Sequence, residues 1–296
     1  MTYAQPSHCD GADTVPLMPA WVTAGRPETS EDVAFLSGAA LAHLHFAVSQ
    51  DDVPQALLRA RLALSAAEAC VVLSGRPERA SDLRDALHLI RPGDHPGPAG
   101  AIYHQWWTAV TRPISVPVLK RAVPDGLETH VPVWLAAVQG GPVRQAAAVL
   151  EAVLADHPTE EASALIMADA ALARGVGWSH LMPILAMGLK RRELRLAGAD
   201  LTTACHSAVT RSSTDALRIA ADLTRRAAYL RAVTPKLRAK GASAAVDIFL
   251  TRDAAAPAAL TSLMSDRAAR RLCDRLVDLG AVRELTGRDT FRLYGV

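Results

Sequence analysis

Residues 264–296 read MSDRAARRLCDRLVDLGAVRELTGRDTFRLYGV. Ser265 is a typical N-cap for a helix that starts at Asp266, and Gly280 is typical of the residue that ends such a helix. Two short segments follow, one on either side of a Thr-Gly-Arg-Asp turn. A capped helix followed by a short hairpin indicates the second half of a winged helix-turn-helix, a fold that places its recognition helix in the major groove of DNA.

The helix that starts at Asp266 has one apolar and one basic face. Its apolar positions recur every three or four residues and predict a buried stripe of Ala269, Leu272, Leu276 and Leu279. The outward part of its N-terminal half carries Arg267, Arg270, Arg271 and Asp274. Because the planar guanidinium group can donate to guanine O6 and N7 or to a phosphate, we expect the outward arginines to contact duplex DNA.

The hairpin contributes further candidate contacts. Side-chain alternation predicts that Phe291 and Leu293 pack on the helix, whereas Arg292 and Tyr294 face away from it. Arg288, at the tip, is expected to reach the DNA backbone or a minor groove. The full set of candidate DNA-binding residues is Ser265, Arg267, Arg270, Arg271, Arg275, Arg288 and Arg292. The alternative is that the same fold joins one protein to another.

The residues upstream complete the expected module. Its elements are a first helix after Gly241, a short second helix at 253–260, a turn at 261–264, and hairpin strands at 281–285 and 290–294. We therefore expect a winged helix-turn-helix-like domain with a β-hairpin wing over residues 235–296.

Positive charge is concentrated in the same part of the chain. Residues 225–296 hold 14 Lys and Arg against 7 Asp and Glu, whereas residues 1–224 hold 18 against 23. Six of these cations lie at 225–240, at the end of a predicted helix and just after it, without an acidic residue between them. A clustered basic surface attracts the phosphate backbone, and this segment is expected to lie along DNA phosphates.

The remainder of the chain has the composition of packed helices. Of the 296 residues, 50% are hydrophobic but only 4% are aromatic, which favours a mainly α fold of two domains. Residues 1–28, rich in Pro and Gly, are expected to be a tail or wrapping arm, and residues 29–234 an all-α domain of antiparallel helical hairpins. Helices are expected from a Thr29 cap to about residue 47 and at 53–73, 80–90, 143–155, 159–174, 178–189 and 214–233, and a Pro- and Gly-rich loop at 91–100.

Other kinds of site receive less support. Cys9, Cys70, Cys205 and Cys273 lack the spacing of a disulfide framework or a zinc site and are expected to be core residues, so no metal and no cofactor is expected. Asp94 and His95, with His104, are an alternative acid-base group, but the loop that carries the first two is better explained as a structural turn. The alanine-rich hairpin at 143–174 is similar to a tetratricopeptide hairpin, but the repeat period of that family does not recur along the chain.

The chain also resembles a known family. Residues 266–288 and the Phe-Arg-Leu-Tyr-Gly run at 291–295 are similar to the C-terminus of a bacterial family described as domain of unknown function 1403. The loop Arg91-Pro92-Gly93-Asp94 with residues 96–100 resembles a second stretch of the same family. This resemblance implies domain boundaries and carries no established activity.

Together these patterns predict a non-enzymatic DNA-binding protein, a transcriptional regulator whose helical domain forms a homodimer, binds an effector or contacts a protein partner. The alternative is a helical adaptor whose winged module contacts protein. No apolar run approaches the roughly 20 residues of a membrane span, and no basic start precedes an apolar segment at the N-terminus. We therefore expect a cytoplasmic protein without a membrane partner.

Overall fold

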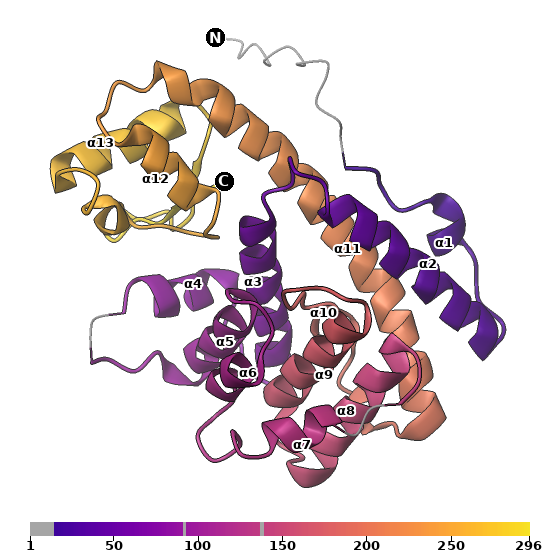
Figure 1. Ribbon diagram of the computed structural model, residues 1–296. Coiled ribbons are helices and arrows are strands. Elements are labelled where there is room, and N and C mark those ends of the chain that lie inside the picture. The colour runs from indigo at the N-terminus through magenta and orange to yellow at the C-terminus, as the bar shows by residue number, and fades with distance from the viewer. Residues whose placement is uncertain (1–14, 91–92, 137–138) are drawn as a thin grey trace.

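A computed structural model describes residues 15–90, 93–136 and 139–296. The protein is mainly helical, with one small two-stranded sheet in the part of the chain described (Figure 1). Its α-helices are α1 Ala20–Ala24, α2 Ser30–Val48, α3 Gln55–Leu73, α4 Ala80–His88, α5 Gly97–Val110, α6 Val116–Ala122, α7 Val131–Ala136, α8 Pro142–Asp156, α9 Glu161–Gly175, α10 Leu185–Gly188, α11 Gly198–Val233, α12 Ala242–Phe249 and α13 Asp266–Asp278. The 3₁₀ helices are η1 Glu193–Arg195, η2 Thr234–Lys236 and η3 Pro257–Leu260, and the strands are β1 Arg283–Glu284 and β2 Tyr294–Gly295.

The long helix α11 organises the arrangement of the other elements. Its 36 residues span about 54 Å at 1.5 Å per residue. The N-terminal half of α11 packs against α2, α8 and α10, and its far end leads to α12 and α13 (Figure 1). The helix predicted to begin at residue 214 in fact begins at Gly198, because buried Leu201, Cys205 and Val209 extend its apolar face. The Ser- and Thr-rich sequence between them obscured this periodicity.

Several predicted helical elements are confirmed. Thr29 caps α2 through a capping box with Asp32, in which the Thr29 side chain accepts the Asp32 backbone N–H. Helices α8 and α9 form the predicted antiparallel hairpin and make the most extensive helix pair in the protein. Residues 15–28 include α1, which packs against α2 and α11, and Val15 and Val22 are buried, whereas residues 1–14 of the expected arm lie outside the described residues.

Two predictions in the helical segment are wrong. The helix expected at 178–189 is reduced to α10, because Pro183 interrupts it and buried Asp169 accepts the backbone N–H groups of Ile184, Leu185 and Ala186 at the start of α10. The loop expected through residue 100 ends earlier, since α5 begins at Gly97 with Pro98 in its first turn, where a proline is tolerated.

The C-terminal segment contains a small sheet and two short helices before α13. Strands β1 and β2 pair antiparallel, with Arg283 opposite Gly295, and Ala255 forms an isolated bridge with Tyr294. The prediction of a helix at 253–260 is therefore wrong for its first half, which is extended. The second half is helical, but it forms the 3₁₀ helix η3. The strand expected at 281–285 shortens to β1, and β2 shares only Tyr294 with the strand expected at 290–294.

The side-chain alternation predicted for the second strand is also wrong. Phe291 is 68% exposed. Its φ of +55° is a left-handed conformation, which bulky residues rarely adopt and which is not found in a regular strand. Leu293 is buried as predicted, but Tyr294, predicted to face away, is buried as well. Residues 291–293 do not form a strand, so strand alternation does not apply to them, and Tyr294 instead forms a bridge with Ala255.

The core is continuous from the helical segment into the C-terminal segment. One cluster of buried apolar side chains includes Tyr103 and Trp106 of α5 together with Phe249 of α12 and Leu276 of α13. Cys70, Cys205 and Cys273 are buried free thiols, as predicted, while Cys9 lies outside the described residues. None of the described helices is long and apolar enough to cross a membrane.

Candidate nucleic-acid interface

Local sequence signals define both ends of α13. The Ser265 hydroxyl accepts the backbone N–H of Ala268, which satisfies one of the free donors at the helix start. At the other end Gly280 has a φ of +68°, and the Ala281 N–H donates to the Leu276 carbonyl as in a Schellman motif. The N-cap and the C-terminal glycine are therefore confirmed where the sequence placed them.

The outward side of α13 is divided into two stripes by its contacts. Arg267, Arg271 and Arg275 are spaced by four residues, so they share one side of the helix over about 12 Å. All three are exposed, and none makes a hydrogen bond or an ion pair with the residues that the structure describes. We call these three side chains the arginine stripe. Ala269, Leu272, Cys273 and Leu276 bury the opposite side of α13.

The second stripe lies in a groove between α13 and α4. Asp266, Arg270 and Asp274 line this groove, whose volume is about 650 Å³, and the end of α4 and residues 289–292 line its other sides. Arg270 Nε lies 3.0 Å from Asp266 Oδ2, so its charge is already partnered within the helix. The structure thus separates Arg270 from the three arginines that the sequence placed beside it.

The hairpin arginines are engaged within the protein. Arg288 Nη2 lies 2.7 Å from Asp85 Oδ1 of α4, which fixes the tip of the hairpin to the helical segment. Arg292 Nε donates to the Arg288 carbonyl at 2.8 Å, and its guanidinium lies 3.5 Å from Asp289. Contact between these two arginines and a phosphate would require them to exchange partners.

A carboxylate shapes the turn from which Arg288 extends. Although partial burial opposes it, hydrogen bonds from Thr286 and from the Gly287 N–H lower the pKa of Glu284. The ionised Glu284 side chain therefore organises the backbone of the turn and presents Arg288 toward α4.

The attachment of the C-terminal segment to the helices was not predicted. Asp253 follows α12 and is buried, with 1% of its side chain exposed, between Arg61 of α3 and Arg84 of α4. Arg84 Nε lies 2.6 Å from Asp253 Oδ2, and Arg61 also donates to the Val296 carbonyl at 3.1 Å. The sequence offers no signal for this cluster, because its members are separated by as many as 192 positions.

Close backbone packing accompanies this ion cluster. Gly295 passes so near the loop after α12 that a Cβ atom would lie 2.5 Å from the Asp253 carbonyl oxygen. From the other side, the Tyr229 hydroxyl of α11 donates to the Leu279 carbonyl at the end of α13 at 2.8 Å. The orientation of α13 relative to the helical segment is therefore fixed by several independent contacts.

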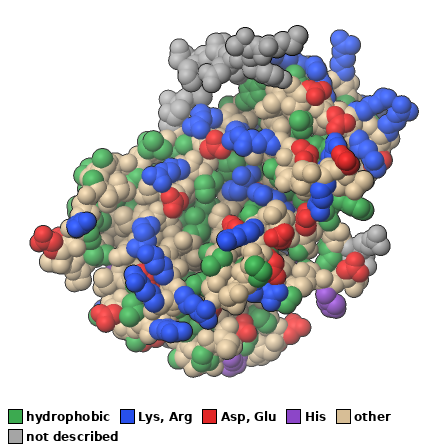
Figure 2. Space-filling view, turned by 180° about the vertical axis from the view of Figure 1, so that it is seen from behind, with side chains coloured by type: hydrophobic (Ala, Val, Ile, Leu, Met, Phe, Trp, Pro, Cys, Tyr) green, Lys and Arg blue, Asp and Glu red, His purple; other side chains and the backbone are tan. Residues whose placement is uncertain are grey.

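The basic segment at the end of α11 is only partly free. Arg225 and Arg226 both pair with Asp222 one turn earlier, at 3.1 and 2.7 Å. The exposed cations beyond them, which form no ion pair within the described chain, are Arg231, Lys236, Arg238 and Lys240. Figure 2 shows Lys and Arg side chains at the end of the molecule that carries the C-terminal segment, with acidic side chains among them, and further Lys and Arg side chains across the rest of this face.

The structure adds no support for the alternative acid-base group of Asp94, His95 and His104. Asp94 and His95 are exposed in the loop before α5, and His104 lies on the exposed side of α5 with its ring centroid 6.5 Å from that of Trp107. Among the described residues, no group of three or more His, Cys, Asp or Glu side chains is placed to hold a metal ion.

These features define a mainly helical protein whose C-terminal segment presents a basic helix and a short hairpin. The chain belongs to the family described as protein of unknown function (DUF1403), whose model matches residues 6–296. The resemblance seen in the sequence is thereby confirmed over nearly the whole chain. No curated protein matches it.

Proposed function

We propose that this protein binds duplex DNA through α13 and acts as a transcriptional regulator. The observation that carries the proposal is the arginine stripe, three exposed guanidinium groups without partners in the described chain on one side of a capped helix. Its length of about 12 Å is comparable to the width of the major groove, so the three side chains can reach bases and phosphates together.

The order of the elements supports a winged helix-turn-helix as the fold of residues 235–296. Helix α12, the bridge at Ala255, η3, α13 and the β1–β2 hairpin follow one another as the three helices and the wing of such a module would. In this assignment α13 is the recognition helix. The first half of α13 carries three arginines and one aspartate, whereas its second half carries Arg275 with Asp274 and Asp278. This difference in charge favours insertion by the N-terminal half.

The remaining candidate residues have more limited roles in this proposal. Ser265 caps the recognition helix, and Arg270, Arg288 and Arg292 would join the interface by exchanging their carboxylate partners for phosphates. A partly exposed pair such as Arg288 with Asp85 contributes about 1 kcal/mol or less, so a phosphate can compete for the arginine. The basic residues after Arg226 would extend the phosphate contacts.

The direct test replaces the arginine stripe. We expect Arg267→Ala, Arg271→Ala and Arg275→Ala together to weaken binding of a random duplex by at least about tenfold, because several phosphate or base contacts are lost. Fluorescence anisotropy of a labelled duplex measures this at constant salt. The variant should remain folded, since all three side chains are exposed and alanine favours a helix.

The matched control removes the same charge elsewhere. Arg191, Arg192 and Arg195 are exposed near η1, so their replacement by alanine should leave most of the DNA affinity intact. If both triple variants lost the same DNA affinity, the loss would reflect net charge alone. That result would contradict the assignment of α13 as the DNA-binding helix.

The second candidate function is a helical adaptor that contacts protein. In this candidate the protein contact lies on α1 and α2 instead of the winged module, because three large aromatic side chains there, Trp21, Phe35 and Phe46, are 56%, 66% and 73% exposed. In this case the arginine stripe variant would keep its full affinity for a protein partner, and the wild-type protein would not bind a random duplex at low salt.

A further inference from the structure

A groove-like cavity lies between α2, the start of α8 and the first half of α11. Its volume is about 590 Å³, within the range of about 300–1,000 Å³ that is typical of small-molecule sites. A second cavity of about 530 Å³ continues from it and shares Ala34, Arg144, Thr202 and His206. We call the first of these the α2–α8–α11 cavity.

Small residues on α2 create the space. Ala34, Gly38 and Ala42 are spaced by four residues and line the cavity on the side of α2. Gly38 is exposed, and a Cβ atom there would meet nothing within 4 Å, so this side of the cavity is open and no neighbouring side chain fills it. From Ala34 to Phe46 the helix advances about 18 Å, which makes the cavity elongated.

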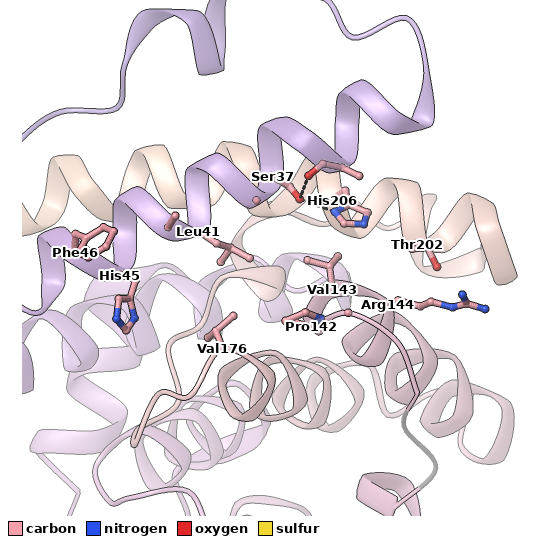
Figure 3. Close-up of a pocket in the computed structure, with 14 residues that line it drawn as sticks. Ser37, Leu41, His45, Phe46, Pro142, Val143, Arg144, Val176, Thr202 and His206 are labelled. Carbon is pink, nitrogen blue, oxygen red and sulfur yellow. Dashed lines mark hydrogen bonds between the residues drawn. The ribbon is translucent and has the colours of Figure 1, made fainter.

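The wall of the cavity is mainly apolar. Leu41, Val143 and Val176 lie along its middle, and Phe46, which is 73% exposed, lies at one end near His45 (Figure 3). The His45 ring is held in place because the Trp178 indole N–H donates to its Nδ1 at 2.8 Å. An apolar ligand body in this space would remove Phe46 and its neighbours from water.

The polar groups gather at the opposite end. The Ser37 hydroxyl is hydrogen-bonded to His206 Nδ1, and Thr202 and the Arg144 guanidinium lie on the same side of the cavity (Figure 3). Among the described residues that line this cavity, Arg144 is the only Lys, Arg, Asp or Glu, and it forms no ion pair with them. Glu151 lines the adjoining cavity together with Arg144, and its Oε2 accepts the Gly198 N–H at 3.2 Å. A cation without an ion-pair partner beside an apolar wall is complementary to an amphipathic anion.

We propose that the α2–α8–α11 cavity binds a small amphipathic carboxylic acid, with its apolar body along Leu41, Val143 and Val176 and its carboxylate at Arg144. The inference rests on the cavity alone and is independent of whether α13 binds DNA. The carboxylate end lies beside Thr202 and His206 in the first part of α11, the helix that leads to the C-terminal segment.

Isothermal titration calorimetry of the full chain with octanoate and with octan-1-ol tests the proposal. We expect saturable binding of octanoate, with an affinity at least about tenfold higher than that of the alcohol, because only the acid pairs with the guanidinium. Arg144→Gln should remove this difference by weakening octanoate alone, and the variant should fold because Arg144 is exposed.

A second variant tests the place of the apolar body. Gly38→Leu should fill the cavity and weaken both ligands by at least about tenfold, whereas Ala155→Leu, on an exposed position of α8 outside the cavity, should weaken neither. Circular dichroism confirms that each variant is folded. The proposal is overturned by an absence of saturable octanoate binding, by equal affinities for acid and alcohol, or by unchanged binding to Gly38→Leu.

Discussion

Asp253 lies between Arg61 and Arg84, and this cluster joins residues of α3, α4 and the segment after α12. Removal of one member of such a cluster destabilises the folded protein, because the remaining buried charge is left without a partner and away from water. At the scale of single residues, this cluster holds the C-terminal segment against the helices.

We expect Asp253→Ala to lower the free energy of unfolding by about 3 kcal/mol, at the low end for a broken buried pair, because Arg61 and Arg84 keep 23% and 15% of their side chains exposed. Urea denaturation followed by circular dichroism measures the change.

The exposed Asp247→Ala on α12 is the control for Asp253→Ala and should change stability by about 0.5 kcal/mol or less. Replacing Arg61 and Arg84 by Met in the Asp253→Ala background should restore much of the loss. A loss below that of the control would contradict the structural role of the cluster.

At the scale of elements, Asp169 determines where α10 begins. Its carboxylate is fully buried in α9 and accepts the N–H groups of Ile184, Leu185 and Ala186 at 3.0, 2.8 and 3.3 Å. Burial raises the pKa of Asp169 to about 7 from its ordinary value near 3.8, although these three hydrogen bonds oppose the rise.

This pKa predicts a dependence of stability on pH. Because the folded state binds the proton more strongly than the unfolded state, the contribution of Asp169 is complete below about pH 4 and is lost as the pH rises through about 7. The free energy of unfolding of the wild type, relative to Asp169→Asn, should therefore fall over this window by as much as about 4 kcal/mol. Thermal or urea unfolding of both proteins at each pH measures it. A difference that rises with pH would show that the carboxylate is ionised throughout.

Elements with local end signals could be predicted from the sequence. The Thr29 cap of α2, the Ser265 cap of α13 and the Gly280 stop all depend on residues within a few positions, and each is found where expected. The segments 178–189 and 253–260 could not be predicted in this way. Their backbones are fixed by Asp169 and by the Arg61 and Arg84 side chains, which are distant in sequence.

In the candidate interface too, features set by local sequence could be predicted, whereas those set by distant contacts could not. The arginines of α13 and their outward direction follow from helical periodicity and were predicted. Which of them lack partners depends on tertiary contacts: the groove beside α4 receives Arg270, and Asp85 of α4 pairs with Arg288. Sequence periodicity therefore gave a wider set of candidates than the three arginines that the structure leaves without partners.

At the scale of the whole molecule, the C-terminal segment and the helical segment share one core. The buried apolar cluster is continuous, and α11 runs from the α2–α8–α11 cavity to the Tyr229 contact with the end of α13 (Figure 1). We therefore expect the basic surface to act as a rigid part of the protein.

The most direct measurement is the affinity of the purified, nucleic-acid-free protein for a random duplex over a salt series. If the arginine stripe contacts phosphates, the logarithm of the association constant should fall with the logarithm of salt concentration with a slope of about −3 or steeper, at about 0.9 per phosphate. The stripe variant should flatten that slope by about 2 to 3. No binding at low salt, or an identical slope in the variant, would contradict the proposal that α13 is a DNA-binding helix.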